Sequence, residues 1–471
     1  MADYRTIIGL EVHVELATKT KTFCSCANDG IGAMPNTLTC PVCLGLPGSV
    51  PTVNKRAIEL TMMAGLLLNS KIATRIMFER KNFFSPDMPK GYQLCQFTMP
   101  IGKGGEVKLD SGKTVLLNRI HLEEDAGKLI HKEDKTLIDY NRSGAPILEI
   151  VTEPQELSTQ EVIEFLDRLR HILAIGGISG CRMEAGEFRY DVNVSVTDSN
   201  KLGTRIELKN LTSSKALMNA IEYEENRLKT AIENGEELVP ETRVWSEDFE
   251  KTYVVRPKEA VSDYRHFPDP DIAIINITKY DIIRQREELP ERYESRVARY
   301  KARGFEDRQI DILTSSKAVS DFMDDTCKFT SHKEEVYNWI SGEMLRVYRN
   351  MSRQDFASII SAEDLAQLVN MIMLGDISRT NAKIVFDQVV ETGRSVASIV
   401  KEQEMTGAVT IEDLGGILTQ ILSNSPELAA DYRADKISVS NYIIGQVKAI
   451  TNGKALAKDI LAVLDDMFDN E

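Results

Sequence analysis

The sequence lacks any apolar run long enough to cross a bilayer, and its first residues, MADYRTIIGL, lack the charged and then apolar pattern of a secretion signal. It also contains neither the P-loop pattern G-x-x-x-x-G-K-S/T nor the dinucleotide pattern G-x-G-x-x-G. These absences argue against a membrane protein and against a P-loop or Rossmann nucleotide site. We therefore expect a cytoplasmic protein without a P-loop or Rossmann nucleotide site.

Cysteine is scarce as well, with 7 residues among 471, which argues against a disulfide-based scaffold. Four of them nevertheless gather in the segment FCSCANDGIGAMPNTLTCPVC as two close pairs, Cys24 with Cys26 and Cys40 with Cys43. Two such pairs joined by a loop suit tetrahedral binding of zinc, and four cysteines without another donor imply a closed, structural site. We expect a zinc insertion at residues 24–43, against the alternative of free or disulfide-linked cysteines.

Positive charge is in deficit, because the formal net charge is −15, and this argues against a general coat for nucleic acid. Residues 436–458, KISVSNYIIGQVKAITNGKALAK, are an exception, because they carry four lysines and no acid. The strip fits a solvated helix face, and it also fits a contact with nucleic-acid phosphates.

The chain is long enough for about two to four domains, and its texture changes along its length. Residues 1–294 mix alternating strand patterns with amphipathic helices, whereas helical patterns follow one another from residue 295 onward. We expect an α+β fold with a core at 1–294, a helical domain at 295–405 and a helical tail domain at 406–471. The clearest elements are a strand at 7–16 and helices at 56–68, 159–175 and 213–233.

The segment GLEVHVEL, residues 9–16, alternates apolar residues with Glu11, His13 and Glu15, which is the pattern of a half-buried strand. Further acid-rich segments could complete this polar row. They are HLEEDAGK (His121, Glu123, Glu124, Asp125), APILEIVTEP (Glu149) and RMEAGEFRYDVNVSV (Glu184, Arg189, Asp191). Carboxylates that converge on one sheet face repel each other unless a cation neutralises them, and oxygen-rich sites with an imidazole suit Mg²⁺ or Mn²⁺. The alternative is a network of salt bridges.

The segment FERKNFFSPDMPKGYQLCQF combines cations with aromatic residues. They are Arg80, Lys81, Phe83, Phe84, Lys90 and Tyr92. Cations there could bind phosphates and the rings could stack on bases. An ordinary surface loop with aromatic residues turned into the core fits equally well.

Several segments, in this order, resemble the B subunit of the bacterial and organellar tRNA-dependent amidotransferase, the GatCAB complex. They are GLEVHVEL, RKNFFSPDMPKGYQ, HLEEDAGK, NRSGAPILEIVTEP, FRYDVNVSV, GTRIELKNL and DYRHFPDPDI. The resemblance runs over the whole chain, including a tail domain of the YqeY type. It implies a catalytic core that resembles the glutamine synthetase and guanidino kinase fold, an antiparallel sheet carrying the acids, followed by all-α domains that embrace tRNA.

The same resemblance implies an ATP- and Mg²⁺-dependent ligase reaction. The side-chain carboxylate of misacylated Glu-tRNA(Gln) or Asp-tRNA(Asn) is phosphorylated, and ammonia channelled from an amidase A subunit then forms Gln-tRNA(Gln) or Asn-tRNA(Asn). A small C subunit completes the heterotrimer. Two alternatives remain open: a non-catalytic, zinc-braced scaffold that binds tRNA for a partner amidase, and a small-molecule ligase that would need no helical tail.

The motifs also imply roles for particular residues. The Mg²⁺ ligands and catalytic residues would be Glu11, His13, Glu124 and Glu149. Residues that bind the nucleotide, its phosphates or a second metal ion, or that support the site, would be Lys81, Lys90, Tyr92, Glu184, Arg189, Asp191 and Lys209. The four cysteines match the zinc motif of some family members, and Lys448 and Lys454 fall where the tail meets tRNA.

Overall fold

The structure is a computed structural model of the chain. It describes residues 4–30, 32–199, 201–257, 261–348, 356–402, 411–434, 436–451, 454–455 and 457–469. The chain divides into two compact units, residues 1–317 and 318–471. The predicted domain boundary at 294–295 stays a prediction, and the one at 405–406 lies outside the described residues. Among the described helices, none combines the length and the apolarity needed to span a membrane.

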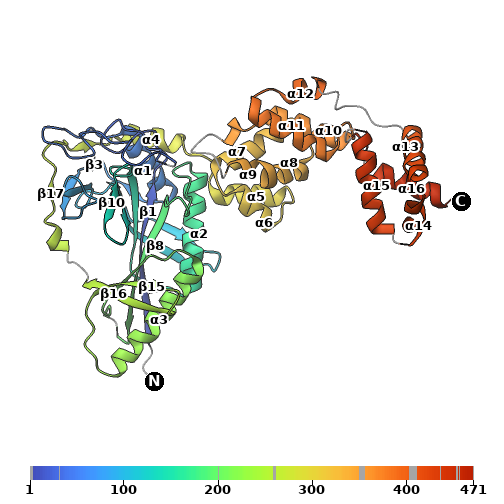
Figure 1. The fold of residues 1–471 in the computed structure, drawn as a ribbon. Coiled ribbons are helices and arrows are strands. Elements are labelled where there is room, and N and C mark those ends of the chain that lie inside the picture. The colour runs from blue at the N-terminus through green and yellow to red at the C-terminus, as the bar shows by residue number, and fades with distance from the viewer. Residues whose placement is uncertain are drawn as a thin grey trace. The chain divides into compact units, whose positions relative to one another are not determined.

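A large, mostly antiparallel sheet forms the frame of the first unit (Figure 1). Its strand order is β16-β15-β14-β13-β1-β11-β8-β6-β2, with β12 paired to β1 and β7 to β8, and only β14 and β15 are parallel neighbours. The strands are β1 (Arg5–Glu15), β2 (Lys71–Ile72), β6 (Gly102–Lys103), β7 (Glu106–Lys108), β8 (Thr114–Glu124), β11 (Pro146–Thr152), β12 (Gln155–Glu156), β13 (Phe188–Thr197), β14 (Ile206–Lys209), β15 (Glu241–Ser246) and β16 (Lys251–Pro257).

One face of this sheet is apolar and carries the core. Leu10, Val12 and Val14 of β1 are fully or almost fully buried, as the alternation predicts. They share one hydrophobic cluster with side chains from α1 (Lys55–Leu67), α2 (Thr159–Ile175) and α3 (Ser214–Glu233). These bounds confirm the predicted helices to within one or two residues, and Ser158 and Glu161 form the capping box that starts α2.

Smaller elements complete the first unit. A three-stranded sheet comprises β17 (Phe267–Pro268), β4 (Glu79–Asn82) and β5 (Tyr92–Cys95), and two pairs are formed by β3 (Arg75–Ile76) with β18 (Ile275–Asn276) and by β9 (Lys128–His131) with β10 (Thr136–Asp139). The helices α4 (Lys279–Glu287), α5 (Tyr293–Ala302) and α6 (Asp307–Leu313) follow.

The described elements of the second unit are all helical. They are α7 (Lys317–Thr326), α8 (Lys333–Trp339), α9 (Leu345–Tyr348), α10 (Ala362–Leu374), α11 (Arg379–Thr392), α12 (Val396–Glu402), α13 (Ile411–Asn424), α14 (Pro426–Ala434), α15 (Lys436–Ile450) and α16 (Ala457–Asp469), with short 3-10 and π turns between some of them. Leu414, Leu418, Val447 and Leu464 belong to a separate core in the last four helices. An antiparallel-dominated α/β part followed by helices confirms the predicted fold class at this level.

Candidate functional site

The polar face of the sheet places acids and histidines side by side across neighbouring strands. In the strand register Glu149 of β11 lies opposite His121 of β8 on one side and His13 of β1 on the other. His13 in turn lies opposite Arg189 of β13. The row therefore crosses four strands that are distant in sequence, because each strand presents alternate residues to the same face.

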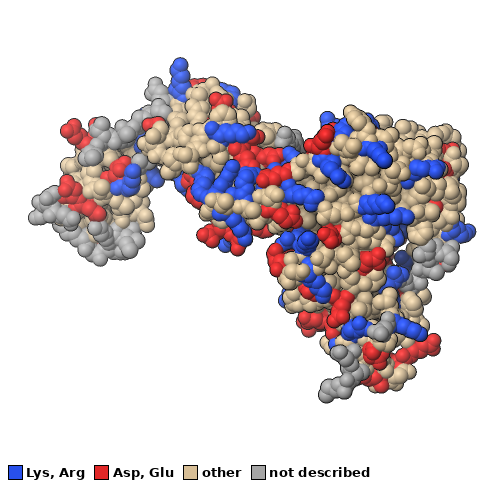
Figure 2. All heavy atoms as spheres, turned by 180° about the vertical axis from the view of Figure 1, so that it is seen from behind, with Lys and Arg blue, Asp and Glu red and all other residues tan. Residues whose placement is uncertain are grey.

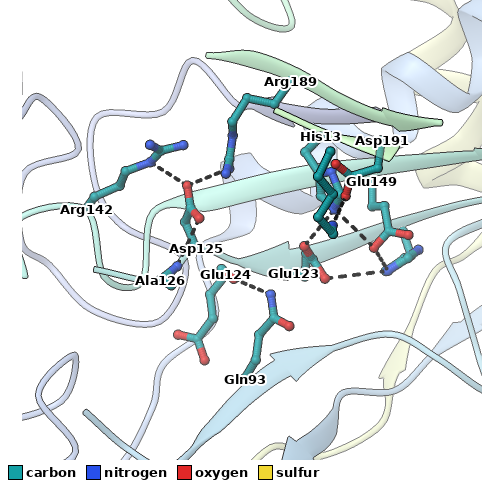
Figure 3. A network of polar contacts seen from close by, with 12 residues as sticks. His13, Gln93, Glu123, Glu124, Asp125, Ala126, Arg142, Glu149, Arg189 and Asp191 are labelled. Carbon is teal, nitrogen blue, oxygen red and sulfur yellow. Dashed lines mark hydrogen bonds and ion pairs between the residues drawn. The ribbon is translucent and has the colours of Figure 1, made fainter. Parts of the chain in front are cut away.

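Within this row the side chains of His13, Glu123 and Glu149 converge (Figure 3). Nε2 of His13 lies 3.7 Å from Oε1 of Glu123 and 3.8 Å from Oε2 of Glu149. Nε2 of His121 lies 3.1 Å from the same Glu149 oxygen. Glu123 and Glu149 are 5% and 8% exposed, so this is a buried acid pair held between two imidazoles.

Burial and neighbouring charges shift the pKa values of Glu123 and Glu149 in opposite directions. Burial, and then the nearby Glu149, raise the pKa of Glu123 well above its usual value. Burial also acts against ionisation of Glu149, but His121 and His13 outweigh it and hold the pKa of Glu149 well below its usual value. A pair that resists double ionisation is a pair that a bound cation would stabilise in its doubly charged form.

Lys81 of β4 adds a positive charge to this group. Its Nζ lies 4.7 Å from the ring centre of Tyr264. Burial lowers the pKa of Lys81, but the attraction of Glu123 and Glu149 outweighs it and raises that pKa above its usual value. The ammonium is therefore retained beside the acids, where it could contact a phosphate.

The donor set fits a hard divalent cation. One ligand atom from each of His13, Glu123 and Glu149 lies within 4.8 Å of the other two, which is close enough for all three to contact one ion. Two carboxylates and one imidazole leave positions for water or substrate oxygen, as Mg²⁺ and Mn²⁺ require.

Glu11, a predicted metal ligand, belongs to a second polar group on the same face. Its Oε1 accepts a hydrogen bond of 3.1 Å from Nδ2 of Asn193, and Asp191 lies opposite it in the register. Lys209 of β14 forms an ion pair with Asp191, and its Nζ lies 3.7 Å from Oε1 of Glu207. Burial lowers the pKa of Lys209, but these acids outweigh it and raise that pKa.

Glu124, the other predicted ligand from HLEEDAGK, is not part of the cluster. Its carboxylate pairs with Lys90 and accepts a hydrogen bond of 2.9 Å from the backbone N–H of Leu94. In Figure 3 its side chain points away from Glu123 and Glu149, and Gln93 donates to its backbone oxygen at 2.7 Å. The physical reason is strand alternation: neighbours in β8 point to opposite faces, so Glu123 joins His121 and Glu124 does not.

The remaining predicted residues are dispersed. Arg189 donates to Oδ2 of Asp125 at 2.8 Å, and Nε of Arg142 lies 2.5 Å from the same oxygen. Burial acts against ionisation of Asp125, but these two arginines lower its pKa. Glu184 is exposed in a turn.

Tyr92 and Lys90 line a separate cleft of about 170 Å³. The cleft also borders Arg80, whose guanidinium carbon lies 4.3 Å from the ring centre of Tyr92. Lining residues also come from 42–51, at the end of the cysteine-rich segment and just after it. Lys90 therefore lines this cleft while its ammonium pairs with Glu124 at the end of β8.

The four cysteines do come together. One ligand sulfur from each of Cys24, Cys26, Cys40 and Cys43 lies within 4.8 Å of the others. The sulfurs of Cys40 and Cys43 are 3.9 Å apart, and a tetrahedral site with Zn–S bonds of about 2.3 Å places its sulfurs roughly 3.8 Å apart. A hydrogen bond with Cys24 is the largest cause that lowers the pKa of Cys43, to about 4. The cluster therefore fits a closed zinc site.

Sequence comparison matches the two parts of the chain to two family profiles. The profile of the GatB/GatE catalytic domain covers residues 6–283, and that of the GatB domain covers residues 321–467. The chain belongs to the GatB family. The predicted resemblance is thereby confirmed, and the His13–Glu123–Glu149 cluster lies within the part matched to the GatB catalytic domain.

Three curated relatives, each the B subunit of an aspartyl/glutamyl-tRNA(Asn/Gln) amidotransferase, illustrate the extent of the match. The protein of Caldicellulosiruptor saccharolyticus is 41% identical, over 96% of both chains. The protein of Geotalea daltonii is 40% identical over 96% of this chain and 97% of that one. The protein of Persephonella marina is 37% identical over 99% of this chain and its own full length.

The lysine strip lies in the part matched to the GatB domain. Lys448 is half-buried on α15, Lys454 is half-buried between α15 and α16, and Lys458 is exposed. The side chain of Lys436 lies outside the described residues. On the face seen in Figure 2, acidic and basic residues are interspersed over both units, so the net charge of −15 does not appear there as one acidic surface.

The motifs assigned no metal-ligand role to His121 or Glu123, although both were named as residues that could complete the polar row, and Glu207 was expected only to support the site. The signal was present for the first two, because His121 and Glu123 are spaced by two in the strand pattern of HLEEDAGK and so share a face. Glu207 shares a strand with Lys209 at the same spacing, but its strand partners become evident only from the register.

Proposed function

We propose that this chain is the ATP- and Mg²⁺-dependent B subunit of a tRNA-dependent amidotransferase. It would phosphorylate the side-chain carboxylate of misacylated Glu-tRNA(Gln) or Asp-tRNA(Asn) in the cytoplasm. Ammonia from glutamine, released by an amidase A subunit and channelled through the heterotrimer with a small C subunit, would then displace phosphate. Membership of the GatB family and the names of the relatives support this proposal.

The observation that carries the proposal is the cluster of His13, Glu123 and Glu149 beside Lys81. A carboxylate is a poor acyl donor, whereas an acyl phosphate has phosphate as its leaving group. Phosphoryl transfer depends mainly on positioning and on neutralising charge. A Mg²⁺ ion bound by these three side chains would neutralise charge on the phosphates of ATP.

Other residues of the chain would have separate roles in the reaction. His121 holds Glu149 ionised and oriented through its 3.1 Å contact. Lys81 supplies a fixed cation that can orient a transferring phosphoryl group. The second group, with Glu11, Asp191 and Lys209, is suited to a further metal ion or to the polyphosphate, because its lysine and acids lie on the same sheet face.

The test uses the assembled complex with ATP, Mg²⁺ and misacylated tRNA, but without an amide donor. The wild-type chain should form ADP and an acyl phosphate on the aminoacyl-tRNA. Glu149→Gln should lower this formation by more than about a hundredfold, since it removes a charge that the cluster needs in the transition state. Glutaminase activity of the A subunit should persist.

The matched control is Glu133→Gln, an exposed glutamate in the turn between β9 and β10, which should leave phosphorylation unchanged. Undiminished phosphorylation by Glu149→Gln would refute the metal-site proposal. Absence of any ATP-dependent chemistry in the wild-type complex would instead favour the non-catalytic tRNA-binding scaffold.

The finer parts of the proposal rest on the fold and on the cysteine cluster. A core like that of glutamine synthetase and the guanidino kinases agrees with acids on one face of an antiparallel sheet. The four clustered cysteines support a structural Zn²⁺ site. The lysines Lys448 and Lys454 on the helical tail support a contact with tRNA phosphates.

A further inference from the structure

Lys21 is a lysine with 0% of its surface exposed. Its Nζ lies 3.8 Å from Sγ of Cys43 and donates to the backbone oxygen of Tyr140 at 3.4 Å. Within the part of the chain that the structure describes, no carboxylate forms an ion pair with it. Burial of an ammonium without a counter-charge is energetically unfavourable, so we expect its negative partner among its neighbours.

The cysteine cluster can supply that charge. Four thiolates around one Zn²⁺ carry a net charge of −2 by formal count. The ammonium of Lys21 is in contact with one of these sulfurs. One positive charge offsets half of this excess, so the ammonium would stabilise the zinc-bound cluster.

Backbone contacts fix Lys21 in this place. Its N–H donates to the oxygen of Cys26 at 3.0 Å, so its main chain is tied to the first cysteine pair while its side chain reaches the second. The N–H of the next residue, Thr22, donates to the oxygen of Gly144 at 2.9 Å. A Cβ at Gly144 would lie 3.5 Å from Cβ of Cys43 and 3.7 Å from Cδ of Lys21, so the lysine stem is closely packed beside the cluster. It would also lie 3.7 Å from Oε2 of Glu124, whose carboxylate pairs with Lys90.

We propose that Lys21 is the buried counter-cation of a zinc tetrathiolate at the four-cysteine cluster, and that it raises the affinity of this site for zinc. The inference rests on the zinc site proposed above. Lys21 contacts a ligand sulfur and would act through it, so it is a positioning residue and not a metal ligand.

The experiment compares the full-length chain with and without zinc in three forms: wild type, Lys21→Met and Lys21→Arg. Zinc affinity is measured by competition with a chelator, and the melting temperature of each form by calorimetry. Lys21→Met should weaken zinc binding by about 10- to 100-fold, the range typical of groups that orient or balance a metal ligand. It should lower the melting temperature of the zinc-loaded chain more than that of the zinc-free chain, because weaker zinc binding stabilises the folded chain less.

Lys21→Arg keeps the charge, so it should retain the increase in melting temperature that zinc produces. This holds even if the larger guanidinium group lowers the melting temperatures of the zinc-loaded and the zinc-free chain alike. Lys19→Met, which removes an exposed lysine two residues away, should change neither quantity. Should Lys21→Met not fold, Lys21→Gln permits the same comparison and can still donate to Tyr140.

Equal zinc affinity in wild type and Lys21→Met would overturn the role of Lys21. So would an equal loss of melting temperature in both metal states, because a lysine that only fills space affects both alike. A wild-type chain that binds no zinc would overturn the zinc site itself, which is a different and separately recognisable result.

Discussion

Glu123 and Glu124 are consecutive residues of β8 whose carboxyl groups lie in different surroundings. Glu123 meets His13 and Glu149, whereas Glu124 forms a buried ion pair with Lys90. Both acids are buried, at 5% and 2% exposure, so burial alone does not separate a metal ligand from a structural acid. Their partners do.

The two residues therefore give opposite predictions for metal binding. With Mn²⁺ as a probe, Glu123→Gln should weaken binding by more than about tenfold, the loss typical even of a residue that only orients a ligand. Glu124→Gln should leave Mn²⁺ affinity unchanged, but lower the free energy of unfolding by about 3–5 kcal/mol, because Lys90 would stay buried without its partner. Isothermal titration and denaturant unfolding measure the two quantities.

The outcome decides whether Glu123 or Glu124 of HLEEDAGK is the metal ligand. If Glu124→Gln abolishes Mn²⁺ binding while Glu123→Gln does not, the cluster seen here is not the metal site. His131→Gln, which changes an exposed residue of β9, is the control for both measurements.

At the scale of single elements, sequence periodicity was sufficient to predict individual strands and helices. The alternation in GLEVHVEL predicted β1, and the apolar spacing with Ser158 and Glu161 predicted α2 to the residue. Those signals are local. The pairing of Glu149 with both His13 and His121 depends on the order of strands in the sheet, which no local pattern contains. Hence the sequence indicated which segments carry the site, but not which acids of each segment meet.

The contact between α2 and α6 is a further element-scale feature. Nε2 of His171 lies 3.2 Å from Oδ1 of Asp311, and its ring stacks on Tyr293 of α5 with centres 5.3 Å apart. The hydrogen bond from His171 is the first cause that lowers the pKa of Asp311 below its ordinary value of 3.8. A lowered carboxyl pKa stabilises the folded chain above the unfolded pKa, and this contribution is lost as pH falls through the lowered value.

Asp311→Asn should therefore lower the melting temperature near pH 5, and by less as pH falls below about 4. The effect should be small, under about 1 kcal/mol, because the Asp311 side chain is 65% exposed and solvent screens the pair. Calorimetry of both chains across this range tests it. A difference that grows towards low pH would contradict the assigned direction of the pKa shift.

On the scale of the whole chain, the acid cluster of the candidate site lies in the first unit, and the described elements of the second unit are helical. The chain is acidic overall, yet phosphates must be bound by both halves if the proposed substrate is aminoacyl-tRNA. The first unit would meet this need with Lys81 and Lys209 among its acids. The tail has the lysines of α15 and the segment that follows it.

Replacement of Lys448 and Lys454 by glutamate should therefore weaken tRNA binding and flatten its dependence on salt. Each phosphate contact contributes about 0.7–0.9 to the slope of log affinity against log salt, so the loss of two contacts should reduce that slope by roughly 1–2. Lys55→Glu with Lys108→Glu makes the same change of charge at side chains that are 76% and 75% exposed on the first unit. A general charge effect would reduce the salt slope equally in both double variants, whereas a local phosphate contact would reduce it only in the tail variant. Equal slopes in the tail variant and the wild type would mean that these lysines are solvated surface.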